Sequence, residues 1–335
     1  MLSRLIHAKS AFKASSSKLI STTVQWQARF TRDGLRQRLK QPIRSETKKP
    51  PTFDNRPDAI PVRPVSDLWK ALGFTVVIGS TAYAAAAIIL YERERRKIKD
   101  IFRQMNFAGL FSVPEQTDLL STPGIKWALA VIGLNAGVFL AWRVPALNAV
   151  MWRFFSNSYA SKSLCSPMLL SCFSHYSAIH LALNMYVLFS FVPPAINKFL
   201  GLEQFTAFYL TAGVVSSLAS LAHKAITRSP FRALGASGAI LGAIVYTCMK
   251  IPDARLSIIF LPMFTFSAEH AVYGLMAFDL AGLLLGFRMF DHAAHLGGAV
   301  FGLWYALYGE KFYLQVIQPR VIETYKSIRG PPTAF

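Results

Sequence analysis

Charged residues are scarce in this chain: they make up 16% of its 335 residues, whereas 53% are hydrophobic. Between residues 126 and 309 there are only 16 Asp, Glu, Lys or Arg residues. Ordinary soluble domains carry about 25% charged residues. The composition therefore excludes a single water-soluble globule and predicts a membrane domain over that range.

Cysteine is also rare. The three residues Cys165, Cys172 and Cys248 are an odd number and include no CxxC pair. Such a set in apolar surroundings indicates neither a disulfide framework nor a zinc knuckle. We expect no metal ion and no cofactor.

Acidic residues are absent from positions 1–32, which contain six Lys or Arg residues and many Ser and Thr residues. This composition is typical of a mitochondrial presequence, with a disordered basic tail as the alternative. A secretory signal needs an apolar core of about seven residues or more, and none occurs before Leu68. Residues 42–64, rich in proline and charge, are expected to form a linker that packs no core.

The net charge of +19 raises the question of nucleic acid as a partner. However, 14 of the 36 basic residues precede Leu68, and no basic patch rich in aromatic residues follows. We expect no nucleic acid partner. The basic run from Arg93 to Arg103 is interpreted as a solvated helix end, with a cardiolipin-contacting surface as the alternative.

Long apolar segments are what the sequence has in abundance, and a helix needs about 20 mostly apolar residues to cross a membrane. The seven candidate spans are Leu68–Tyr91, Trp127–Trp142, Ile179–Phe199, Phe205–Ala222, Leu234–Ile251, Ala271–Phe287 and Ala294–Tyr308. A charged stretch separates the first span from the other six. We therefore predict an all-α polytopic membrane protein in a 1+6 arrangement.

The connections between these spans carry two further predictions. The segment Leu256–Phe266 is too short to span and is expected to form a loop that dips into the membrane interface. Pro193 and Pro194 are expected to end or bend the third span. The predicted parts of the chain are a presequence and disordered linker (1–64), the extra transmembrane helix and charged linker (65–125), a six-helix core (126–310) and a C-terminal tail (311–335).

Polar side chains are costly inside a membrane span, so each is a candidate for function. The candidates are His180, Asn184, Ser237, Asp279 and His295. The third, fifth and seventh spans cross in the same direction and therefore begin at the same membrane face. All candidates except Asp279 lie in the first turns of these three spans, so we expect those four side chains to reach a similar depth.

The chemistry of these four residues fits acyl transfer. His180 and Asn184 are four residues apart, so they project from one helix face and can donate hydrogen bonds to one oxyanion. Ser237 is flanked by small residues that leave its hydroxyl uncrowded, which suits a nucleophile. His295 precedes glycines with GxxxG spacing, which would let the seventh span pack tightly against the fifth. The imidazole could then contact Ser237 and act as its base.

Each of these signals also has a structural interpretation. Small residues in an apolar helix commonly serve packing, and a lone membrane histidine commonly bonds a neighbouring helix. Asp279, in the middle of the sixth span, is interpreted as a structural hydrogen bonder well below Ser237 and His295, with a third catalytic member as the alternative. We expect His175 to be a satisfied surface histidine, with a donor of hydrogen bonds to water at the cavity mouth as the alternative. Asp291 is expected to lie in the loop before His295.

In combination, these residues resemble the rhomboid intramembrane serine proteases, whose motifs are GxSG, HxxxN and AHxGGxxxG. The corresponding residues are Gly235–Gly238, His180–Asn184 and Ala294–Gly302. The resemblance covers roughly residues 65–315 and is strongest to mitochondrial members of the family.

This resemblance implies a six-helix core with one added helix. It also implies a Ser237–His295 dyad without an acid, with His180, Asn184 and the Ser237 amide holding the oxyanion. The implied substrates are single-pass membrane proteins with helix-destabilising or small residues near the cut. For mitochondrial members it implies the inner membrane and roles in quality control, apoptosis and mitochondrial shape. Leu241 replaces a tyrosine that packs on the catalytic histidine in well-studied bacterial members.

Three other functions remain as alternatives. A metal-dependent protease would use Asp291, His292 and His295, but the sequence lacks the HExxH pair. A transporter would line a solute path with polar groups at one depth. A catalytically inactive rhomboid-like protein would bind clients without cleaving them, and the presence of both dyad residues disfavours it.

Overall fold

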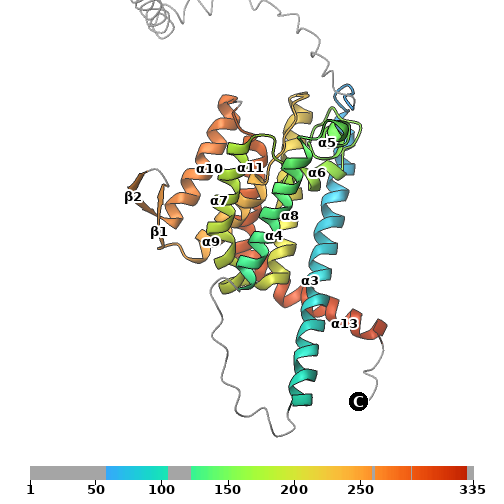
Figure 1. Cartoon of the computed structure of the whole chain (residues 1–335), viewed down its shortest axis with the longest axis vertical. Coiled ribbons are helices and arrows are strands. Elements are labelled where there is room, and N and C mark those ends of the chain that lie inside the picture. The colour runs from blue at the N-terminus through green and yellow to red at the C-terminus, as the bar shows by residue number, and fades with distance from the viewer. Residues whose placement is uncertain (1–57, 105–121, 259–260, 288, 330–335) are drawn as a thin grey trace, which may run out of the picture. The chain divides into compact units, whose positions relative to one another are not determined.

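The computed structural model describes residues 58–104, 122–258, 261–287 and 289–329. The predicted presequence and most of the linker after it lie outside these ranges. Helices make up most of the described chain and stand side by side in a bundle (Figure 1). The all-α polytopic membrane fold is thus confirmed.

The first long helix is α3 (Leu68–Gln104), which follows a short turn, η1 (Val65–Asp67). The apolar half of α3 is the first predicted span, and its charged half continues the same helix. Its 37 residues give a length of about 55 Å. Along part of that length it packs against α8 (Gly201–Ile226) (Figure 1).

The rest of the chain forms a helical core and a helical C-terminal segment. The other α-helices of the core are α4 (Pro123–Ala141), α5 (Asn148–Phe154), α6 (Ser166–Leu170), α7 (Ala178–Pro194), α9 (Ser237–Lys250), α10 (Ala268–Leu285) and α11 (His292–Trp304). The short turns are η4 (Pro145–Leu147), η5 (Ser171–Phe173) and the π-helical η6 (Ala195–Leu200), η7 (Tyr305–Gly309) and η8 (Tyr313–Ile317). The C-terminal helices are α12 (Glu310–Phe312) and α13 (Gln318–Arg329).

The helices α7 and α8 are separated as the proline pair predicts. The α-helical geometry of α7 ends at Pro194, and the chain continues as η6. A proline ring clashes with the preceding turn and removes an amide donor, which favours this change of geometry. The φ angle of Gly201 is +72°, and α8 begins there as a separate helix.

By length and composition, four helical stretches among the described residues could span a membrane. They are Val65–Ile101, Pro123–Ala141, Ala178–Ile226 and Ala268–Leu285. The third of these contains both α7 and α8. In addition, α9 is a shorter apolar helix of 14 residues, and the 13 residues of α11 continue into η7. The 1+6 count therefore stays a prediction.

Aromatic rings fill the centre of the core. The Phe208 ring of α8 lies 5.4 Å from that of Tyr246 in α9 and 5.0 Å from that of Tyr305 in η7. Pairs at such distances add to the packing attraction between helices. They hold α8, α9 and η7 together in the core.

The described residues of the segment Leu256–Phe266 form two strands rather than the expected loop. The strands β1 (Arg255–Ile258) and β2 (Leu261–Ser267) pair antiparallel, with Leu256 opposite Phe266. Side chains alternate between the two faces of a strand, and both of these residues are partly buried. The prediction of a loop was wrong because strand pairing satisfies backbone groups that an apolar loop would leave unpaired. The position of this segment at the membrane interface stays a prediction.

Residues 58–63, which we call the N-terminal strap, also differ from the prediction of an unpacked linker. Asp58 is buried, and its carboxylate lies 2.9 Å from the Arg232 guanidinium. Arg63 donates its backbone amide to the carbonyl of Tyr159. The strap thus ties the segment before α3 to the segment before α9, a contact between residues 174 positions apart that composition does not reveal.

Candidate active site

The Ser237 hydroxyl lies 2.8 Å from Nε2 of His295. Ser237 is the first residue of α9, and His295 lies in the first turn of α11. The two residues therefore meet where neighbouring helices begin. Both side chains are half-buried, so the pair is shielded but still reachable.

Glycines on α9 and α11 make this meeting possible. A side chain on Gly298 would overlap the carbonyl of Gly238, and one on Gly302 would overlap the carbonyl of Gly242. The two backbones are thus in direct contact over a full helical turn. Small residues at this spacing are what allow membrane helices to approach so closely.

The His180 ring and the Ser237 hydroxyl both lie next to Gly235. Gly235 has φ +142°, a conformation that residues with side chains rarely adopt. A Cβ built on Gly235 would lie 2.8 Å from Cε1 of His180 and 3.8 Å from Oγ of Ser237. The imidazole of His180 is therefore near the atom that would attack a substrate.

Asn184 follows one turn later on α7 and is buried. Its side-chain amide donates one hydrogen bond to the carbonyl of His180, at 2.9 Å, and carries a second N–H. The backbone amide of Ser237 belongs to the first turn of α9, where amides have no partner within the helix. These groups can together stabilise an oxyanion formed at Ser237.

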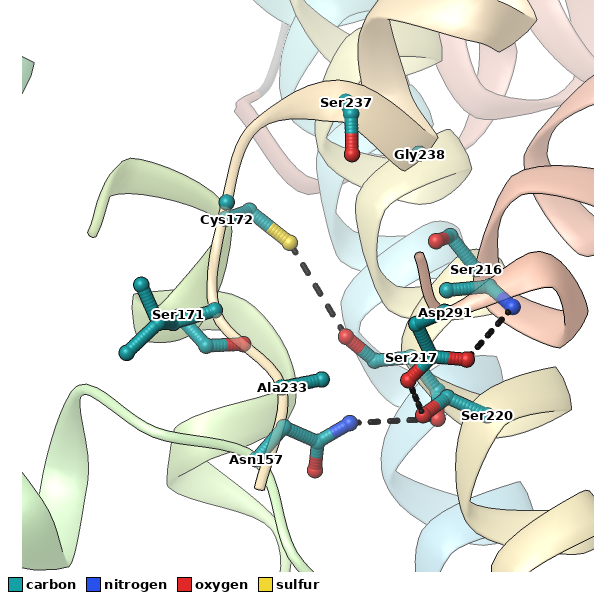
Figure 2. Close-up of a pocket in the computed structure, with 13 residues that line it drawn as sticks. Asn157, Ser171, Cys172, Ser216, Ser217, Ser220, Ala233, Ser237, Gly238 and Asp291 are labelled. Carbon is teal, nitrogen blue, oxygen red and sulfur yellow. Dashed lines mark hydrogen bonds between the residues drawn. The ribbon is translucent and has the colours of Figure 1, made fainter. Parts of the chain in front are cut away.

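A polar pocket lies next to Ser237 (Figure 2). Its interior has about 40 Å³ of space for water-sized molecules, enough for a few of them. Figure 2 shows the Ser237 hydroxyl at one end of the pocket and Ser220 and Asn157 at the other. Sequence reasoning missed Ser220 and Asn157, because a single polar residue of this kind carries little signal. The serines that line it besides Ser237 are Ser171, Ser216, Ser217 and Ser220.

Asp291 fixes the first turn of α11, which carries His295. It accepts hydrogen bonds from the Ala294 amide at 3.1 Å, the Ser220 hydroxyl at 2.6 Å and the Lys224 ammonium at 2.9 Å. Burial would raise the pKa of Asp291, but Lys224 and Ser220 hold that pKa at about 2. The residue is thus an anionic N-cap, placed before His295 as expected.

The expectation of a surface position for His175 is wrong. The side chain is wholly buried, and Nε2 accepts a hydrogen bond from the Ala236 amide at 3.5 Å. Its ring lies 5.0 Å from that of His180, and burial lowers the pKa of His175 to about 4. A loop residue becomes buried only through its tertiary neighbours, which the local sequence does not specify.

The expectation that Asp279 lies well below Ser237 and His295 is also wrong. Its Oδ1 lies 2.7 Å from Nδ1 of His292 and 3.2 Å from Nδ1 of His295. The depth argument fails because α10 continues past Asp279 to Leu285, a rise of about 9 Å. The chain then turns back, so α11 begins alongside Asp279 rather than level with the end of α10.

Comparison with known proteins places this site in a family. A profile of the Rhomboid domain matches residues 151–312, a range that contains both Ser237 and His295. The presenilin-associated rhomboid-like protein, mitochondrial, of Rattus norvegicus is 45% identical over 269 residues, which cover 77% of this chain and 71% of the relative. This chain belongs to the rhomboid family.

Two further rhomboid relatives show how far the likeness reaches. Presenilin-associated rhomboid-like protein A, mitochondrial, of Danio rerio is 39% identical over 291 residues, 78% of this chain and 76% of the relative. Rhomboid protease GluP of Bacillus subtilis (strain 168) is 29% identical over 146 residues, 43% of this chain and 25% of the relative. By its name, the Bacillus subtilis relative is a rhomboid protease.

In this rhomboid, Leu241 is buried in the core. The His295 ring packs instead against Phe290, with 5.9 Å between the ring centroids. Phe290 lies in the connection between α10 and α11. An aromatic contact on His295 is therefore present but comes from a different segment.

Proposed function

We propose that this rhomboid is an intramembrane serine endopeptidase that cleaves transmembrane segments of single-pass proteins. The observation that carries the proposal is the 2.8 Å contact between Oγ of Ser237 and Nε2 of His295, next to a pocket wide enough for water. A hydroxyl bonded to an imidazole is activated because the base takes its proton as the oxygen attacks. The name of the Bacillus subtilis relative gives further support.

The proposed reaction has two halves. Oγ of Ser237 attacks the peptide carbonyl carbon while its proton moves to Nε2 of His295, and His180, Asn184 and the Ser237 amide face the resulting oxyanion. Collapse breaks the C–N bond, and the amine leaves with the proton from His295. Water then attacks the acyl ester, with His295 taking and returning a proton, which releases the carboxylic product and restores the serine.

The test compares variants on a single-pass substrate in proteoliposomes. Ser237→Ala and His295→Ala should each abolish cleavage and labelling of the protein by a fluorophosphonate probe. Ser190→Ala and His270→Ala make the same changes away from the site and should cleave normally, as should the wild type with a chelator. The proposal fails if Ser237→Ala cleaves normally.

Loss of cleavage on chelation would instead favour the metal-dependent alternative. Among the residues that the structure describes, no three His, Cys, Asp or Glu side chains are arranged to hold a metal ion.

We further propose that this protein acts in the mitochondrial inner membrane, on proteins involved in quality control, apoptosis and mitochondrial shape. The names of its mitochondrial relatives and the acid-free first 32 residues support this location. Residues 1–40 fused to a reporter should carry it into mitochondria. A reporter that stays in the cytosol would contradict the proposed targeting.

A further inference from the structure

A buried carboxylate lies behind the imidazole of His295. Asp279 is 2% exposed, and its Oδ1 lies 3.2 Å from Nδ1 of His295. The other ring nitrogen, Nε2, contacts Ser237. Hydrogen bonds therefore connect Ser237, His295 and Asp279 across three helices, α9, α11 and α10.

This geometry determines where the proton of a neutral His295 lies. A neutral imidazole carries one proton, and a carboxylate only accepts hydrogen bonds. The contact with Asp279 therefore requires the proton on Nδ1, which leaves a lone pair on Nε2 for the Ser237 hydroxyl. With the proton on Nε2, the ring could not act as the base and two acceptors would face each other at Asp279.

We propose that Asp279 is a positioning residue for His295. Its carboxylate fixes the Nδ1–H tautomer and the ring orientation, and it stabilises the positive charge that the ring gains with the Ser237 proton. The inference rests on the proposed protease function and adds a third member to the implied two-residue dyad. It also supplies an orienting contact in a chain that has Leu241 in place of the tyrosine.

A second histidine offers the competing explanation. Nδ1 of His292 lies 2.7 Å from the same Oδ1 of Asp279, and its ring occupies the space that Gly282 leaves by lacking a side chain. Nε2 of His292 is buried, with no hydrogen-bond partner among the described residues. If Asp279 served only to satisfy His292, replacing either residue would affect stability and leave His295 unchanged.

Two variants separate these explanations. Asp279→Asn keeps the shape of the side chain and removes its charge, whereas His292→Phe removes the second partner and leaves the contact with His295. We expect Asp279→Asn to lower kcat and the rate of Ser237 labelling by about 100-fold or more, with KM within about three-fold of wild type. His292→Phe should keep both rates within about five-fold. The proposal is overturned if Asp279→Asn loses less than ten-fold, or if the two variants lose equally.

A second measurement needs no variant of Asp279 and so holds even if Asp279→Asn does not fold. In wild-type protein with ¹⁵N-labelled histidine, the ring signals of neutral His295 should show the proton on Nδ1, with the assignment made by their loss in His295→Gln. A proton on Nε2 would overturn the proposal. Cleavage by Ser237→Ala would refute the protease function instead, and the tautomer would still report on Asp279.

Discussion

Gly298 of α11 lies directly against the carbonyl oxygen of Gly238 in α9, with no room for a side chain between them. His295 precedes Gly298 by three residues, and Ser237 precedes Gly238 by one. This backbone contact therefore sets the distance between the proposed base and the proposed nucleophile.

Gly298→Ala should separate the two helices and lower the rate of Ser237 labelling by about 100-fold, because a displacement of about 1 Å can cost that much. Gly274→Ala on α10 is the control, since a Cβ there would meet nothing within 4 Å. Labelling kinetics of purified variants provide the measurement. If Ser237 in Gly298→Ala is labelled at the wild-type rate, the backbone contact does not set the geometry of Ser237 and His295.

Asn184→Ala should lower kcat by about 10² to 10³, the usual loss for one oxyanion donor, because His180 and the Ser237 amide remain. Leu183→Ala, a change at an exposed neighbouring position, should cleave at the wild-type rate. Steady-state cleavage of a single-pass substrate measures both. An unchanged rate in Asn184→Ala would remove this residue from the oxyanion site.

Asp58→Ala should destabilise the protein by about 3–5 kcal/mol, because it removes the negative charge that offsets a buried guanidinium. Lys70→Ala, which breaks an ion pair with a largely exposed lysine, should cost about 1 kcal/mol or less. Unfolding measurements in detergent would compare them. The double variant Asp58→Ala/Arg232→Ala should lose less than the sum of the single changes, and strict additivity would argue against the pair.

Asp291→Asn should reveal a pH-dependent part of the stability. The pKa of Asp291 in the folded protein, about 2, lies below the usual value near 3.9. At pH values above about 3.9 the charged form therefore stabilises the fold by about 2 kcal/mol. The contribution is lost as the pH falls through about 2. The difference in the free energy of unfolding between wild type and variant should therefore be largest at neutral pH and vanish in strong acid. A difference independent of pH would contradict the role of the charge.

The sequence predicts the helical membrane fold and the meeting of Ser237 with His295, because apolar length and glycine spacing are local signals. The contact of Asp279 with His295 is not predictable in this way, since it depends on the stagger between α10 and α11. The burial of His175 and Asp58 depends on partners 61 and 174 residues away. Pairing of β1 with β2 likewise requires knowing which segments lie side by side.

The length of α3 has a mechanical consequence. The N-terminal strap, which precedes this uninterrupted helix, holds Arg232, shortly before Ser237, and Glu92, about two thirds of the way along the helix, contacts Tyr325 and Arg329 of α13. The hydrocarbon layer is about 30 Å thick, and α3 is nearly twice as long. The helix therefore links α13 to the N-terminal strap, and through Arg232 to the segment that precedes Ser237, so we expect a displacement of α13 to be felt at that segment.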